Sequence, residues 1–398
     1  MRLLCLTARL PYPPDRGDRL RAYRFLERLG REHELHLLSF IADRRELAHL
    51  PALRAVCAEV RTVYQPAWRS ALAVGLNLWR SAPLQLLYYR SRAMQRQVDA
   101  WRRAVPFDAA YIHLFRMAPY LAQARNIYRI VDLTDVISAE VARSLAYRGW
   151  ASRALYRTEL PRIRRYEQVV AEQFEEIWLV SEEDRRALAA RCPSANLQVV
   201  TNGVDLARLR PLDIPAAPHS LILVGHWRVF HNIDAALYLM AEIWPQLRRR
   251  YPDCRLALVG ADPAPEIQAL AAQPGVTVTG FVPDLNQALN QATVFVAPLR
   301  FSAGLQNKVL EAMAAGRPVV TTPQVSLGLG TEAGRHLLVG DSAESLTQHI
   351  LTLWEQPDLA ARLGRAARQF VAERFTWEQA ADRLRAIQTL RLHPPDRR

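Results

Sequence analysis

The chain has 398 residues, too many for one compact core and about right for two domains of roughly 150 residues each. Half of the residues are hydrophobic and 23% are charged, which excludes a disordered protein, a collagen-like repeat and a coiled coil. The formal net charge of +13 is uneven, because residues 1–200 hold 32 basic and 21 acidic side chains while the remainder holds 20 and 18. We therefore expect an anionic partner for the first half.

The sequence shows few signs of a membrane, secretory or disulfide-linked protein. Its apolar runs are shorter than the ~18 residues that a membrane-spanning helix needs. The N-terminal apolar stretch is shorter than a signal-peptide core and is interrupted by Pro11. The four cysteines form no CxxC pair, so their spacing indicates neither a disulfide framework nor a zinc site. These features predict a cytoplasmic protein.

Short β-rich runs alternate with helix-period stretches, a pattern typical of parallel sheets with crossover helices. In the first half the expected strands cover residues 3–7, 35–40, 60–63, 109–113, 129–132, 176–180 and 198–201. A Pro-containing connector over 205–220 then reads as an interdomain linker. Beyond it the expected strands cover residues 220–224, 255–259, 276–279, 293–297, 318–322 and 337–339.

This pattern predicts an α/β protein with two Rossmann-like, doubly wound domains that face each other across a cleft. We expect the first domain over 1–205 and the second over 206–375, with a helix over about 376–392 packing back on the first. One long helix is expected over 233–251. Ligands of open α/β sheets bind beyond the carboxyl ends of the strands, so function should lie in the loops there.

The segment 294–321 carries the strongest functional signal. It reads as a buried strand, a loop ending at Gly304, an amphipathic helix and a second buried strand. Gly304 could let a ligand approach the helix start, where free amide groups favour an anion such as a diphosphate. Lys308 is the single lysine among 52 basic residues, and Glu311 follows on the same helix face. They could bind a phosphate and ribose hydroxyls, or form a surface ion pair.

Residues near expected strand ends in the first half could also carry chemistry. Gly17, Asp18 and Arg19 lie between the first strand and the first helix, where backbone amides could face a ligand. His113 ends one strand and could position an acceptor, while Asp135 follows another and could assist proton removal. A helix cap or first-turn surface position for Asp18 and Arg19, and structural roles for the other two, are the alternatives.

Several segments resemble, in order and spacing, family 4-type glycosyltransferases of the GT-B fold, particularly bacterial sugar transferases of exopolysaccharide systems. They include PPDRGDRLRAYRFLERLGREHELHLLSF, TNGVDLARLRPL, LILVGHWRVFHNIDAALYLM, LALVGADP, VTVTGFVPDLNQALNQATVFVAPL, GLQNKVLEAMAAGRPVV and RFTWEQAADRL. The resemblance implies a retaining enzyme that moves a sugar from a nucleoside-diphosphate donor to a lipid-linked or polysaccharide acceptor. It also implies that no metal and no cofactor take part. The first domain would bind the acceptor and the second domain the donor.

The resemblance also implies a set of donor-binding residues, namely Gly225, His226, Arg228, His231, Gly304, Leu305, Asn307, Lys308 and Glu311. Glu311 matches the second acidic residue of the family's Glu-x7-Glu motif, which holds the donor ribose. The first acidic position falls on Ala303, so this chain lacks the carboxylate that usually supports the transferred sugar. The family places acceptor and donor-phosphate contacts near the loop around Gly17.

A second departure from the family pattern follows Gly225. Many members carry there an Arg and a Lys that grip the diphosphate, and this chain has His226 and His231. Arg228 and Lys308 could supply the missing charge, because a diphosphate leaving group needs cationic neutralisation whichever side chain provides it.

The basic region 53–116 carries ten Arg against three acidic residues, interleaved with Trp and Tyr. It could contact anionic membrane headgroups at the inner face of the plasma membrane or a phosphorylated acceptor, or be an ordinary arginine-rich solvated surface. A nucleic-acid partner is not expected, because the first half lacks zinc-finger spacing and a recognisable RNP motif.

Two alternatives to an active glycosyltransferase remain. The first is a catalytically weak nucleotide-binding subunit of the same fold. The second is a nicotinamide-dependent oxidoreductase, which requires a GxGxxG turn after the first strand. That turn is absent from the sequence, and Gly328, Gly330 and Gly334 miss the spacing by one residue.

Overall fold

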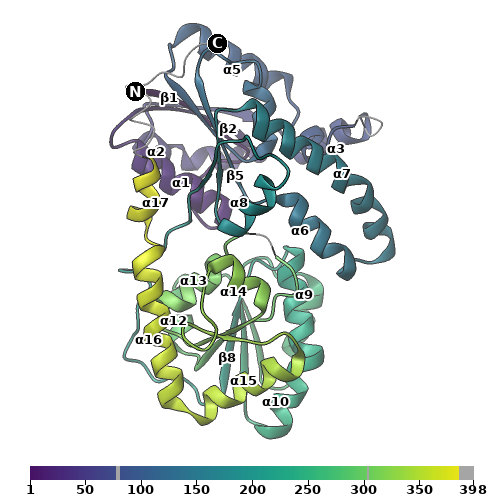
Figure 1. Ribbon diagram of the computed structural model, residues 1–398, viewed down its shortest axis with the longest axis vertical. Helices are drawn as coiled ribbons and strands as arrows, with labels where there is room; N and C mark the ends of the chain where they lie inside the picture. Colours follow the sequence, from purple (N-terminus) through teal and green to yellow (C-terminus); the bar gives the residue numbers. More distant parts are fainter. Residues whose placement is uncertain (78–80, 303, 385–398) are drawn as a thin grey trace. The chain divides into compact units, whose positions relative to one another are not determined.

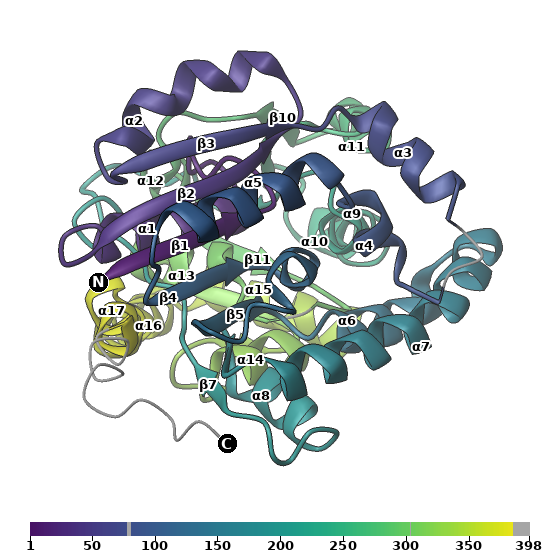
Figure 2. The same ribbon diagram turned by 90° about the horizontal axis from the view of Figure 1, so that it is seen from above.

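The computed structural model describes residues 1–77, 81–302 and 304–384 (Figure 1). They form two compact units, which we call unit 1 (Met1–Val200, with 381–384) and unit 2 (Thr201–Ala380). Each unit is a parallel sheet with helices on both faces (Figures 1 and 2). This confirms the predicted α/β class with two Rossmann-like, doubly wound sheets.

Unit 1 contains a seven-stranded sheet in the order β3-β2-β1-β4-β5-β6-β7, in which neighbouring strands are parallel. Its strands are β1 (Arg2–Thr7), β2 (Glu34–Ile41), β3 (Glu59–Tyr64), β4 (Ala109–His113), β5 (Tyr128–Thr134), β6 (Glu176–Leu179) and β7 (Leu197–Val199). Alternate side chains of β1 are buried on opposite faces, with Leu4 and Leu6 in one core cluster. Burial of both faces explains why its central strands read as continuous apolar runs.

The helices of unit 1 cover the two faces of this sheet. They are α1 (Gly17–Leu29), α2 (Leu50–Arg54), α3 (Ala67–Gly75), α4 (Leu84–Tyr88), α5 (Arg92–Ala104), α6 (Ile137–Ser144), α7 (Trp150–Gln173) and α8 (Glu182–Ala189), with 3₁₀ turns η1 (Arg44–His49), η2 (Phe115–Leu121) and η3 (Leu145–Tyr147). Serine hydroxyls cap two of them, since Ser91 accepts from the amide of Met94 in α5 and Ser181 from that of Asp184 in α8.

Unit 2 contains a six-stranded sheet in the order β10-β9-β8-β11-β12-β13, also with parallel neighbours. Its strands are β8 (Ser220–Val224), β9 (Arg255–Val259), β10 (Val276–Gly280), β11 (Val294–Ala297), β12 (Val319–Thr321) and β13 (Leu338–Val339). In both sheets each expected strand is found within two residues of its predicted bounds.

The expected helix over 233–251 is interrupted. It forms α9 (Phe230–Tyr238), a π-helical turn η4 (Leu239–Ile243) and α10 (Trp244–Arg250). Pro245 at the start of α10 has no amide hydrogen to donate to the preceding turn, which accounts for the break in the α-helical pattern. The other helical segments of unit 2 are α11 (Pro265–Ala269), η5 (Leu270–Ala272), α12 (Leu285–Asn290), α13 (Asn307–Ala314), α14 (Pro323–Leu329), α15 (Ala343–Glu355), α16 (Pro357–Arg374) and the first part of α17 (Trp377–Leu384).

The two units divide after Val200, a few residues before the expected boundary at 205/206. The intervening residues belong to unit 2 because they bond to it. The side-chain amide of Asn202 donates to Asn307 Oδ1 at 2.8 Å, and Val204 bridges to Thr376. A Cβ on Gly203 would lie 2.3 Å from the amide nitrogen of Trp377, so this position has room for glycine alone. Of the expected helix over 376–392, the part from 385 onward lies outside the described residues.

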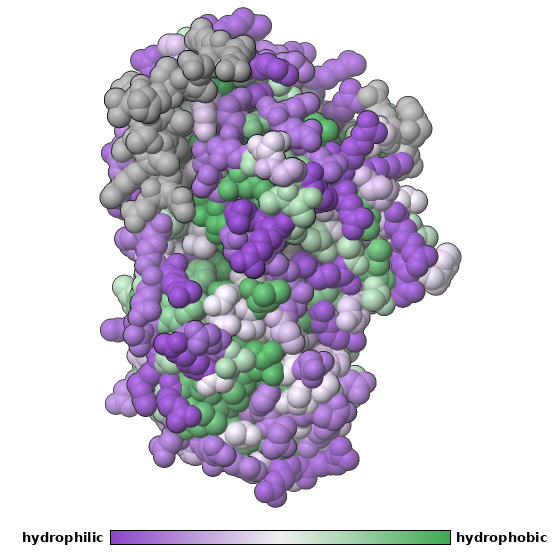
Figure 3. Space-filling view, viewed as in Figure 1, coloured by the Kyte–Doolittle hydropathy of each residue, from purple (hydrophilic) through white to green (hydrophobic). Residues whose placement is uncertain are grey.

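Hydrophilic residues cover most of the face of each unit shown in Figure 3, and hydrophobic residues form separate patches on it. Among the residues that the structure describes, no helix is both long enough and apolar enough to cross a membrane.

Candidate functional site

Both sheets have a point where the strand order reverses direction, and open α/β sheets bind ligands beyond the carboxyl ends of the strands at such points. In unit 1 this point lies between β1 and β4, and in unit 2 between β8 and β11. The predicted donor-binding residues follow β8 and β11, so the fold of unit 2 brings their two loops to one edge of the sheet.

Gly225, directly after β8, is held by a close backbone contact. Its amide donates to the carbonyl of Val259 at 2.9 Å, and a Cβ on Gly260 would lie 1.7 Å from the Gly225 oxygen. Gly260 also has a φ of +145°. A side chain at Gly260 would therefore push the loop after β8 out of place.

Lys308, in the first turn of α13, contacts the helix that follows the loop after β8. Its ammonium donates a hydrogen bond to Oδ1 of Asn232, which is buried in α9. The side-chain amide of Asn232 in turn donates to the carbonyl oxygen of His226 at 3.1 Å. Asn232 thus links Lys308, which we predict to bind the diphosphate, to the loop after β8 through two hydrogen bonds. Asn232 was not predicted from the sequence, because its partner lies 76 residues away.

Burial opposes the charge of both titratable residues on α13, Lys308 and Glu311. Burial lowers the pKa of Lys308 to about 7, although the negative charge of Glu311 acts in the opposite direction. Burial raises the pKa of Glu311 to about 7, against the positive charges of Arg208 and Lys308. The charged forms of Lys308 and Glu311 are therefore disfavoured in the free protein. Such perturbed pKa values are common at sites where a charged ligand binds.

His226 and Arg228 lie beside a carboxylate that the sequence analysis did not select. Nε2 of His226 is 3.4 Å from Oδ2 of Asp262, and Nε of Arg228 is 3.9 Å from the same oxygen. Asp262 follows β9 with a φ of +52°, so this non-glycine residue has a left-handed backbone at the same edge of the sheet. His231 lies in the first turn of α9 and is half-buried.

The remaining donor-site predictions fall in the loop before α13. Gly304 has a φ of +56°, in the left-handed region that favours glycine, and Leu305 is buried. Asn307 begins α13 and accepts the hydrogen bond from Asn202 described above. Ala303 lies outside the described residues.

In unit 1 the structure places His113 beside Asp132. The His113 Nδ1 lies 3.6 Å from Oδ2 of Asp132, and the hydroxyl of Tyr111 donates to the same carboxylate oxygen at 2.7 Å. Arg21 Nε also donates to this oxygen at 2.7 Å, and both side chains of this ion pair are fully buried. The network fixes the orientation of the His113 ring at the end of β4.

Asp135, the predicted proton acceptor, lies in a different environment. Burial raises its pKa well above the usual value, and the nearby charge of Asp184 raises it further. Asp184 accepts hydrogen bonds from the Ser181 hydroxyl at 2.6 Å and from the Val136 amide at 3.1 Å. Burial and the neighbouring carboxylate thus disfavour the charged form of Asp135, and its role as a proton acceptor stays a prediction.

The predicted loop residues Gly17, Asp18 and Arg19 form the first turn of α1. Arg19 donates to Asp15 at 3.2 Å and to Glu46 at 3.3 Å, so two carboxylates already bind its guanidinium. Asp18 accepts a hydrogen bond from Nη1 of Arg9 at 3.3 Å. Asp18 therefore lies next to a cation that the sequence analysis did not consider.

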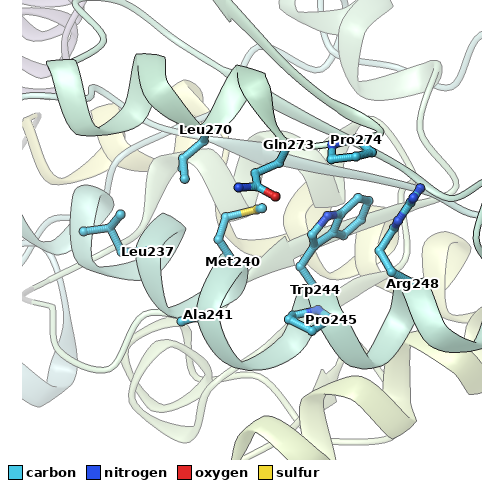
Figure 4. Close-up of a pocket in the computed structure, with 9 residues that line it drawn as sticks. All are labelled: Leu237, Met240, Ala241, Trp244, Pro245, Arg248, Leu270, Gln273 and Pro274. Carbon is cyan, nitrogen blue, oxygen red and sulfur yellow. The ribbon is translucent and has the colours of Figure 1, made fainter.

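A surface groove of about 440 Å³ lies elsewhere on unit 2 (Figure 4). It is lined mainly by apolar side chains, namely Leu237, Met240, Ala241, Trp244, Pro245, Arg248, Leu270, Gln273 and Pro274. The predicted donor-binding residues are not among these, so the groove is separate from the candidate site. In the described part of the chain, no group of three or more His, Cys, Asp or Glu side chains could hold a metal ion.

Comparisons with known proteins agree with the α/β fold of two parallel sheets. Residues 218–356 match the family described as "Glycosyl transferases group 1". A GDP-mannose-dependent alpha-(1-6)-phosphatidylinositol monomannoside mannosyltransferase of Mycolicibacterium smegmatis is 30% identical over 357 residues, which cover 81% of this chain and 88% of that protein. Sucrose-phosphate synthase of Thermosynechococcus elongatus is similar in fold, with a TM-score of 0.76 and 17% identity over 99% of this chain and 100% of that one. Anabaena HepE, solved in complex with UDP-glucose, has a TM-score of 0.65 and 15% identity over 97% and 100% of the two chains.

Proposed function

Since the chain belongs to the group 1 glycosyl transferases and has the GT-B fold of its structural neighbours, we propose that it is a retaining enzyme whose unit 2 binds a nucleoside-diphosphate sugar. The observation that carries the proposal is the hydrogen bond from Lys308 to Asn232, beside the loop after β8. It places the chain's single lysine at the switch point of unit 2. Unit 1 is the proposed acceptor-binding unit.

The proposed chemistry depends on charge balance at the leaving group. The Lys308 ammonium, with His226 and Arg228, neutralises the diphosphate as its bond to the sugar breaks. Glu311 accepts hydrogen bonds from the ribose hydroxyls, and the half-buried position of Lys308 and Glu311 strengthens both contacts. In a retaining reaction the acceptor attacks the face that the nucleotide leaves, and a phosphate oxygen takes its proton. We accordingly propose that the reaction needs neither a metal ion nor a protein base.

A direct test is donor binding followed by turnover. Purified protein is screened by thermal shift against GDP-mannose, UDP-glucose, the free nucleoside diphosphates and NADH, because a ligand of the folded state raises the melting temperature. We expect one sugar nucleotide to raise it and to be hydrolysed slowly, with activity unchanged by EDTA. Stabilisation by NADH alone would contradict the proposal.

A catalytically weak nucleotide-binding subunit is the second candidate. The observation that favours it is Ala303, which stands where related enzymes carry the first acidic residue of their motif. Such a subunit would bind the sugar nucleotide tightly and leave it intact over a prolonged incubation, so the turnover arm of the same experiment separates the two candidates.

We further propose that the acceptor is a lipid-linked or polysaccharide substrate of cell-surface glycan synthesis, used at the cytoplasmic face of the membrane. Supporting this, α3 lies at the periphery of unit 1 (Figures 1 and 2), and three exposed apolar side chains lie on it or directly after its end. Trp68, Leu72 and the following Leu76 recur every four residues and are 63%, 54% and 57% exposed. The guanidinium of Arg69 lies 5.2 Å from the ring centre of Trp68. Exposed apolar side chains next to arginine suit an anionic lipid surface.

Membrane contact is tested with vesicles that contain phosphatidylglycerol. We expect the double variant Trp68→Glu/Leu72→Glu to lower vesicle partitioning by about tenfold or more, since it removes two apolar contacts and adds two negative charges. Salt should weaken binding of the natural chain. Phe281→Glu is the matched control, because Phe281 is 70% exposed on unit 2. Equal losses in both variants would remove the membrane argument.

A further inference from the structure

The switch point of unit 1 gathers two guanidinium groups around one carboxylate. Arg9 follows β1 and Arg116 lies in η2, directly after β4. The Arg9 Nη1 is 3.3 Å from Oδ2 of Asp18, in the first turn of α1. The Arg116 guanidinium lies 5.2 Å from the ring centre of Tyr89, a buried residue.

The charges of this cluster do not cancel. The side chain of Tyr89 lies beside both guanidiniums, so Arg9 and Arg116 are neighbours. Burial lowers the pKa of Arg116, and the positive charge of Arg9 lowers it further. Burial would raise the pKa of Asp18, but Arg9, His113 and Arg116 together hold it below its usual value. Asp18 is therefore negatively charged at neutral pH and balances one of the two cations. The remaining positive charge favours an anionic ligand.

The backbone beside the cluster is under strain. Leu114, which connects His113 to η2, has a φ of +72° although it is a buried, branched residue. Such conformations cost free energy and concentrate at functional sites. Among the described residues, Nε2 of buried His113 has no hydrogen-bond partner, although its Nδ1 faces Asp132. A buried nitrogen in this state suits a polar ligand at the end of β4.

We propose that Arg9 and Arg116 bind a phosphate group carried by the acceptor. This inference rests on the proposed function and deepens it, because it assigns the acceptor to the phosphorylated or phosphate-linked class. The planar guanidinium pairs with two phosphate oxygens at once, which fits phosphate better than a neutral sugar hydroxyl. The donor's own phosphates are assigned to Lys308, His226 and Arg228 of unit 2. Arg9 and Arg116 in unit 1 are thus available for a second phosphate, which we assign to the acceptor.

The test compares inorganic phosphate binding to full-length variants by calorimetry, all carrying Lys308→Met so that the proposed donor site does not contribute. Arg9→Gln/Arg116→Gln should weaken phosphate binding about tenfold or more, since each removes a charge-assisted contact. Asp18→Asn should tighten phosphate binding about threefold, because it removes the carboxylate that competes for the two arginines. A gain in affinity cannot result from a failure to fold, so this variant also controls for misfolding. Arg31→Gln, an exposed arginine that follows α1, is the control for net charge. Equal weakening by Arg31→Gln, or unchanged binding in the double variant, would overturn the proposal.

A second arm identifies which phosphate is bound. Nucleoside diphosphate affinity and donor hydrolysis are measured in Arg9→Gln/Arg116→Gln with Lys308 intact. The proposal expects both to stay within about twofold of the natural chain. A parallel loss of nucleotide affinity would show that the arginines hold a donor phosphate, which overturns the acceptor assignment. Donor binding that is absent already in the natural chain would instead reject the proposed function and leave the phosphate result standing.

Discussion

Lys308→Met is expected to weaken sugar-nucleotide binding by about 100-fold, because removing one partner of a desolvated charge pair costs about 2–5 kcal/mol. The diphosphate would then lose its contact with the Lys308 ammonium, which donates to Asn232 in the free protein. Isothermal titration with the donor that the nucleotide screen selects gives the affinity. Arg365→Ala, which removes an exposed arginine from α16 of the same unit, should leave it within about twofold.

Lys308→Met should also stabilise the unliganded protein. The folded pKa of Lys308, about 7, lies below that of a lysine in an unfolded chain, about 10.4. Between these values the unfolded chain binds a proton that the folded chain does not, so lysine at this position destabilises the folded state as pH falls through this window. Methionine removes the cost, and we expect a gain of about 1 kcal/mol at pH 8. A variant that loses both affinity and stability would indicate a structural rather than a ligand-binding lysine.

The pH dependence of donor binding supplies a further readout of the pair. Binding requires a charged Lys308 and a charged Glu311, and both pKa values lie near 7. Affinity should therefore be highest near pH 7 and fall on either side, the two limbs belonging to the coupled pair. Lys308→Arg should flatten the alkaline limb, since arginine keeps its charge, and Glu311→Gln should flatten the acidic limb. A profile that stays unchanged in both variants would exclude the pair from the site.

The positions of the strands along the chain were predictable because each central strand is buried on both faces and reads as a short apolar run between turn signals. The positions of Gly225, after β8, and of Lys308 and Glu311, on the helix that follows β11, were predictable for the same reason, since segments after parallel strands meet at one edge of the sheet. The hydrogen bonds within the site were not predictable from the sequence. Asn232 and Lys308 come from different helices, and a single sequence carries no signal for a hydrogen bond between them. The π-helical turn before Pro245 was also missed, because apolar periodicity does not report hydrogen-bond spacing.

Unit 1 contains buried polar contacts that residue type alone does not predict. Asp132 ends the predicted strand over 129–132 and Asp135 follows it, and no partner for His113 was predicted from the sequence. The structure pairs His113 with Asp132, which lies opposite it in the β4–β5 ladder. Arg21 reads as a polar position on an amphipathic helix, yet its side chain is fully buried against Asp132. Buried arginine is rare enough that pattern reasoning assigns it to the surface.

Arg21→Met is expected to destabilise unit 1 by about 3–5 kcal/mol, because it leaves Asp132 as a buried charge without its main partner. Arg21 Nη1 also donates to the carbonyl of Val200 at 2.9 Å, and its guanidinium lies 4.5 Å from the ring centre of Phe25. The loss should be measured by hydrogen exchange at the amides of β4 and β5, which reports on unit 1 separately from unit 2. The exposed substitution Arg31→Met is the matched control and should change protection little.

The dependence on pH distinguishes lost charge from lost packing. Burial would raise the pKa of Asp132, but Arg21 and His113 hold it well below its usual value, so its contribution to stability is present above about pH 4 and is lost as pH falls below that. The difference between Arg21→Met and the natural chain should therefore shrink in acid. Adding Asp132→Leu should recover most of the stability at pH 7, because a buried apolar pair replaces the unpaired carboxylate. A double variant as unstable as the single one would mean that the arginine acts through packing on Phe25 and the bond to Val200 rather than through its charge.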